Sequence, residues 1–142
     1  MGIEKKACRC RLTIFQFLPV AYSNGFMLIK FDMKQYVIDG FSLQDYHTLK
    51  EYFDMHLEAA SVDGIYWFEL ERDVLTPVQS DHESCRPHVF ALMLENTYLS
   101  CELLVRIKTN IKCDCMGYAT KEQRDWLIDQ TDAIFETLSI CI

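Results

Sequence analysis

Long apolar runs are absent from this sequence of 142 residues, and none approaches the ~18–20 residues that a membrane-spanning helix needs. Basic side chains are outnumbered by acidic ones, 14 to 21, which gives a formal net charge of −7. Because Lys and Arg drive binding to phosphate backbones, this charge argues against a nucleic-acid partner. Glycine is scarce too, and five residues are too few for a loop of backbone N–H groups around phosphates.

Motifs typical of enzymes are also missing. The sequence contains no Gly-x-Ser-x-Gly, no His-Glu-x-x-His and no dinucleotide-binding fingerprint. Half of the residues are hydrophobic and 13% are aromatic, so the chain can bury a core and is not expected to be disordered. The length suits one domain. These features favour a small non-enzymatic protein.

Charge divides the chain into two parts. Residues 1–27 hold four basic residues and one acidic residue, a net of +3, and residues 28–142 hold 10 basic and 20 acidic residues, a net of −10. We interpret 28–142 as a single domain and 1–27 as a separate N-terminal segment. The apolar run 12–18 is either an extra strand or the core of a secretory signal with cleavage after Ser23. A third interpretation is an extension upstream of a true start at Met27 or Met33. We expect a cytoplasmic protein, or an exported one if residues 1–23 are a signal peptide.

Two helices are predicted from caps and apolar spacing. Ser42 and Asp45 form a capping-box-like start, after which an apolar stripe at helical spacing runs as far as Ala60. The second helix begins at Thr120, with Gln123 three residues later as its capping partner.

Strands are predicted from alternating or β-branched and aromatic residues in four segments: 29–38, 65–71, 89–94 and 99–107. Residues 72–87 read as a polar loop, with Pro77 and Pro87 as breakers. The order is therefore β-α-β-β-β-α after the N-terminal segment. It predicts an α+β fold: a two-layer sandwich with two helices packed on one face of a mainly antiparallel sheet.

Cysteine and histidine spacing suggests one metal site. The segment His82-x-x-Cys85-x-x-His88 is followed by Cys113-x-Cys115, and zinc favours such sets of nitrogen and sulfur ligands. No other cofactor is indicated. The alternatives are reduced thiols of a cytosolic protein, a disulfide or redox pair, or a nucleophilic Cys85 activated by one of these histidines in a small enzyme. Cys101 shares a strand face with apolar neighbours and is the expected core thiol.

An uncovered sheet face is the basis of the last hypothesis. Two helices cover only one face of the predicted sheet, which leaves Trp67 and Leu104 on the other. We therefore expect a non-enzymatic interaction module that is homodimeric through this face, or that binds another protein there. A zinc-binding domain and a Cys85-centred enzyme are the two alternatives.

Overall fold

The computed structural model describes residues 34–109 and 112–142, so the expectations for residues 1–27 lie outside the described part. Its strands are β1 (Gln35–Asp39), β2 (Glu58–Ala59), β3 (Ile65–Glu69), β4 (His88–Leu94), β5 (Tyr98–Glu102), β6 (Leu104–Ile107) and β7 (Gly117–Tyr118). The α-helices are α1 (Leu43–His56), α2 (Pro77–Asp81) and α3 (Lys121–Thr137), and two 3₁₀ turns are η1 (Arg72–Val74) and η2 (Glu83–Cys85). None of these helices is long and apolar enough to cross a bilayer.

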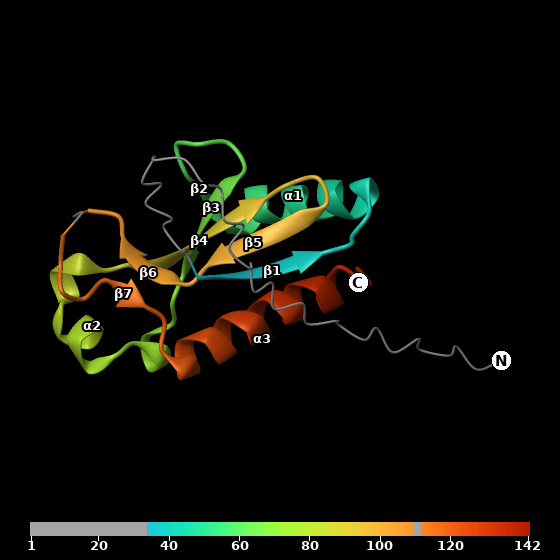
Figure 1. Cartoon of the computed structure of the whole chain (residues 1–142). Helices are drawn as coiled ribbons and strands as arrows, with labels where there is room; N and C mark the ends of the chain where they lie inside the picture. Colours follow the sequence, from blue (N-terminus) through green and yellow to red (C-terminus); the bar gives the residue numbers. More distant parts are fainter. Residues whose placement is uncertain (1–33, 110–111) are drawn as a thin grey trace, which may run out of the picture.

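The strands form one open sheet in the order β1-β5-β4-β3-β2, with β6 paired to β4 and β7 paired to β6 (Figure 1). Each of these pairings is antiparallel. The predicted α+β fold with a mainly antiparallel sheet is confirmed. The chain leaves β1 through Gly40, whose φ of +87° lies in the left-handed region that glycine adopts without strain.

Capping residues define where the long helices begin. The Ser42 hydroxyl accepts the backbone N–H of Asp45, and the Asp45 carboxylate accepts the backbone N–H of Ser42 in return. Thr120 and Gln123 exchange the same pair of bonds at α3. Both predicted helix starts are confirmed. The first helix ends at His56, however, so the predicted continuation to Ala60 is wrong, because Ala60 instead donates to Ile65 across the β2–β3 turn.

The segment 72–87 was predicted as a polar loop, and this prediction is wrong. It contains α2 between the two 3₁₀ turns. Thr76 caps α2 by exchanging hydrogen bonds with Gln79, and Pro77 occupies the first helical position. Proline is compatible with that position because its missing N–H would have no partner within the helix, so here it starts a helix rather than breaking one.

The predicted strand 99–107 is also interrupted. It divides into β5 and β6 at Leu103, whose N–H donates to Lys34 and whose carbonyl accepts from Ala119. Leu92 of β4 pairs with Cys101, and Val89 of β4 pairs with Arg106. Between these two pairs β4 advances by three residues and the β5–β6 segment by five, so the β5–β6 segment contains two extra residues. Because an insertion of two residues preserves the alternation of side chains, Cys101 of β5 and Val105 of β6 both point into the core.

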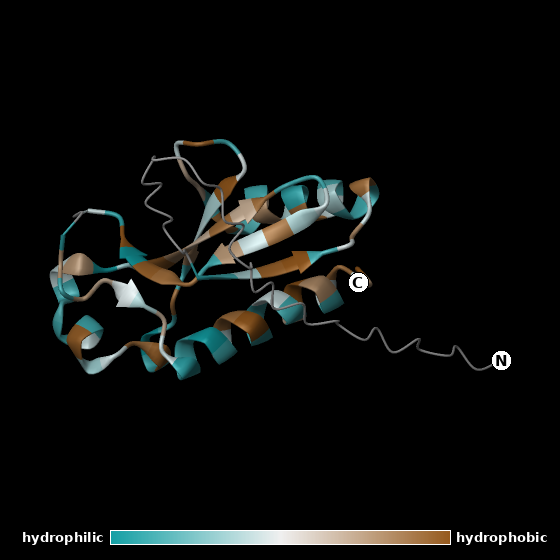
Figure 2. Cartoon of the chain, viewed as in Figure 1, coloured by the Kyte–Doolittle hydropathy of each residue, from teal (hydrophilic) through white to brown (hydrophobic). Residues whose placement is uncertain are grey.

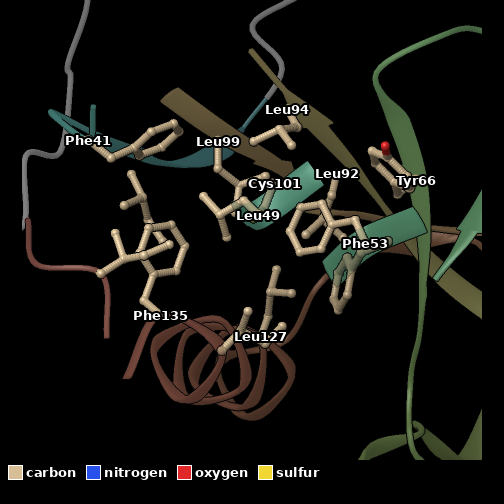
Figure 3. Packing of buried hydrophobic residues seen from close by; sticks show 14 of the residues in the cluster. Phe41, Leu49, Phe53, Tyr66, Leu92, Leu94, Leu99, Cys101, Leu127 and Phe135 are labelled. Carbon is tan, nitrogen blue, oxygen red and sulfur yellow. The ribbon is translucent and has the colours of Figure 1, made fainter. Parts of the chain in front are cut away.

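The core lies between the long helices and one sheet face. Leu49 and Phe53 of α1 and Leu127 and Phe135 of α3 point into the same space (Figure 3). Cys101 is fully buried there, as predicted, and burial raises the pKa of its thiol to about 12. Figure 2 shows hydrophilic and hydrophobic residues interspersed along α3, as expected for a helix with one buried side.

The opposite sheet face carries Trp67 and Leu104. Their neighbours Tyr66 and Val105 belong to the core, and successive side chains of a strand point to opposite faces. Trp67 and Leu104 are both half-buried. The predicted placement of these two residues on the face away from the core therefore agrees with the strand register.

Candidate metal site

Four of the five predicted ligands come together at the end of the molecule where α2 lies against the β6–β7 connection (Figure 1). His82 and Cys85 lie in the short segment between α2 and β4. Cys113 and Cys115 lie just before β7. The donor atoms of these four side chains all lie within 4.8 Å of one another, so the group can hold a metal ion.

Cys113 is the centre of the group. Its Sγ lies 3.0 Å from His82 Nδ1, 3.6 Å from Cys85 Sγ and 3.1 Å from Cys115 Sγ. Tetrahedral zinc with Zn–S of about 2.3 Å and Zn–N of about 2.0–2.1 Å has ligand-to-ligand distances of roughly 3.6–3.8 Å. The contacts of Cys113 Sγ with His82 Nδ1 and Cys115 Sγ would therefore lengthen by roughly 0.6–0.7 Å around such an ion, whereas its distance to Cys85 Sγ already fits.

The Cys-x-Cys turn itself stabilises a thiolate. Hydrogen bonds from the backbone N–H and the thiol of Cys115 lower the pKa of the Cys113 thiol, and His82 and Cys85 add to this effect, which brings that pKa to about 6. Burial and the neighbouring sulfurs raise the pKa of Cys115. The Met116 N–H donates to the Cys113 carbonyl at 3.0 Å and closes the turn. A sulfur that accepts backbone N–H bonds is well suited to be a metal ligand.

No family model, curated protein or solved structure matches this chain.

Two buried glutamines fix the position of the Cys-x-Cys turn. Gln79 donates from Nε2 to the Cys115 carbonyl at 3.3 Å, and its Oε1 accepts from Gln123 Nε2 at 2.7 Å. Gln123 Nε2 also donates to the Val74 carbonyl at 3.0 Å. Because each glutamine also completes a capping box, the starts of α2 and α3 are both joined to the metal-binding segment. These two residues were not predicted to matter for the site, although the Thr76-x-x-Gln79 pattern was visible in the sequence.

His88 does not join the other four residues. It is the first residue of β4, pairs with Ile107 and is 1% exposed. Burial, followed by the nearby charges of Arg86 and His82, lowers its pKa, so the imidazole is neutral. His82 precedes a 3₁₀ turn that ends with Cys85, whereas His88 has entered the sheet. Equal spacing in the sequence therefore does not bring the two histidines to one point.

Cys101 and Cys141, the other cysteines in the described part of the chain, do not belong to the group. Cys101 lies in the core, and Cys8 and Cys10 lie outside the described residues. Cys85, Cys101, Cys113 and Cys115 are free thiols. The three sulfurs that converge on the group are therefore all available as ligands.

Proposed function

We propose that this protein is a zinc-binding domain in which His82, Cys85, Cys113 and Cys115 hold one ion. The observation that carries the proposal is the convergence of one imidazole and three thiols from two segments well separated in the sequence. Thiolate and imidazole ligands are those that zinc prefers, whereas Ca²⁺ and Mg²⁺ require oxygen ligands.

The proposed zinc has a structural role. Four protein ligands complete a tetrahedral sphere, and a catalytic site would keep one position open for water or substrate. The ligands join the α2–η2 segment to the β6–β7 connection, which are short elements with little core of their own. Binding free energy at such a site contributes to the folding of the segments that it joins.

Elemental analysis of the full chain, purified under reducing conditions, tests the proposal. We expect one zinc per chain, and after exchange for Co²⁺ we expect the visible absorption bands of tetrahedral thiolate coordination. His82→Gln should lose most of the metal, whereas His47→Gln, which changes an exposed histidine of α1, should retain it. A folded protein that purifies without metal and takes up no Co²⁺ would contradict the proposal.

A small enzyme centred on Cys85 is the competing chemical hypothesis. The sulfur of Cys85 lies 3.6 Å from that of Cys113, and the imidazole of His82 contacts the same Cys113 sulfur at 3.0 Å. Alkylation of the metal-free protein across a range of pH separates the hypotheses. A nucleophilic Cys85 would react well below the ordinary thiol pKa of ~8.5 and remain reactive when zinc is added, whereas a zinc ligand would be protected.

A further inference from the structure

A cavity that is separate from the metal group lies where the end of β3, the turn η1 and the start of β4 meet. Its volume is about 270 Å³. Leu70, Leu75 and Pro87 form an apolar part of the wall. The polar part of the wall consists of Glu69, Arg72, Arg86 and His88. The cavity has the mixed apolar and polar lining of a site for a small molecule.

Guanidinium groups outnumber carboxylates in the wall, although the whole chain is acidic. The lining contains two guanidinium groups, those of Arg72 and Arg86, and one carboxylate, that of Glu69. Outside the lining, Glu83 Oε1 lies 3.9 Å from Arg86 Nη1. The chain carries a net charge of −7. The Arg86 Nη2 donates to the Ser80 carbonyl at 3.0 Å. Guanidinium groups beside an apolar surface favour an anionic ligand.

Three nitrogen atoms of this wall lack partners among the described residues. They are Nε of Arg86 and both ring nitrogens of His88, and all three are buried. A buried polar group without a hydrogen bond costs about 1–3 kcal/mol, so such groups call for an explanation. Arg86 Nε is a donor, and a neutral imidazole provides one further donor and one acceptor. An oxygen-bearing anion in the cavity would supply an acceptor for Arg86 Nε once that side chain turns toward it.

We propose that this cavity binds a small organic monocarboxylate. The planar carboxylate matches the planar guanidinium groups of the arginines, and the apolar body of the ligand contacts Leu70, Leu75 and Pro87. A phosphate group carries close to two negative charges and would be repelled by Glu69. Because the unpaired nitrogens are covered in the empty cavity, binding includes a small rotation of the Arg86 side chain.

Titration of the ¹⁵N-labelled full chain with benzoate, followed by NMR, tests this proposal. We expect saturable shifts of the amide signals of residues 69–75 and 86–90, with a dissociation constant in the millimolar range or below. Benzamide has nearly the same shape without the charge, and inorganic phosphate has the charge without an apolar body. Both should bind at least about tenfold more weakly than benzoate.

Two variants locate the site. Arg72→Gln removes a charge from an exposed side chain and should weaken benzoate binding about tenfold while leaving the fold intact. Arg124→Gln makes the same change of charge on α3, away from the cavity lining, and should bind benzoate as the wild type does. Absence of saturable shifts, equal binding of benzamide, stronger binding of phosphate, or unchanged binding by Arg72→Gln would each overturn the proposal. None of these results depends on whether the protein contains zinc.

Discussion

At the scale of single residues, the sequence predicted a metal group but could not show which of two histidines belongs to it. His82 and His88 both stand three residues from Cys85, and spacing alone cannot separate them. The separation comes from β4, which takes His88 into the sheet next to Ile107 and leaves His82 beside Cys113. Because strand pairing is a long-range property, no local pattern in 82–88 predicts which imidazole meets the sulfurs.

Gln79 provides a prediction at this scale. It is 4% exposed and donates to the carbonyl of Cys115, so it fixes the backbone directly after one of the proposed ligands. Gln79→Glu keeps an acceptor for the Gln123 amide and the Thr76 N–H but replaces the donor to Cys115 with an oxygen. We expect zinc affinity to fall by about tenfold or more, because second-layer contacts of this kind orient the ligands.

Competition with a chromophoric chelator measures that affinity, and circular dichroism shows that the variant is folded. Gln44→Glu is the matched control, because it makes the same change at an exposed position of α1 and should leave the affinity unchanged. A folded Gln79→Glu protein with wild-type affinity would show that the glutamine pair serves the helix starts alone.

At the scale of elements, local signals predicted the helices better than the strands. A capping box is complete within four residues, so the starts at Ser42 and Thr120 were readable in the sequence. The same pattern at Thr76 was obscured because Pro77 was interpreted as a breaker instead of a first helical residue. The division of 99–107 at Leu103 depends on bonds to Lys34 and Ala119, which no pattern inside that segment reveals.

The prediction at this scale concerns which side of α1 faces the core. Phe53 is fully buried, and its ring lies edge-on to Tyr66 with centroids 5.2 Å apart, whereas His47 is exposed on the other side of the helix. Phe53→Ala should destabilise the protein by about 3–5 kcal/mol, because it loses transfer free energy and leaves a cavity. His47→Ala should change the free energy of unfolding by less than about 0.5 kcal/mol. Urea titrations of both variants check the ranking, and a reversed order would contradict the facing described for α1.

At the scale of the whole molecule, the two sheet faces differ in what they contact. One face receives Leu49 and Phe53 from α1 and Leu127 and Phe135 from α3 (Figure 3). The other carries Trp67 and Leu104, both half-buried. The same face also carries the ion pair between Glu102 and Arg106. Apolar residues gathered on a sheet face within such a polar surround are typical of a surface that meets another protein chain. The homodimer expected from the sequence stays a prediction, and this face is where we expect the subunits to meet.

A two-fold contact between copies is the commonest way to cover such a face, and a stable one buries on the order of 1,200–2,000 Å². We expect a dimer at micromolar concentration that persists at high salt, because contacts through Trp67 and Leu104 are apolar and are not screened as surface ion pairs are.

Trp67→Lys should shift the protein to monomers, since it places a charged side chain in the apolar contact on each subunit. Glu95→Lys, at an exposed position of the turn between β4 and β5, is the matched control and should remain dimeric. Light scattering at low and high salt measures the mass of each. A wild-type monomer in both conditions would refute the dimer, and dissociation by salt alone would exclude an apolar interface and assign the contact to charged residues.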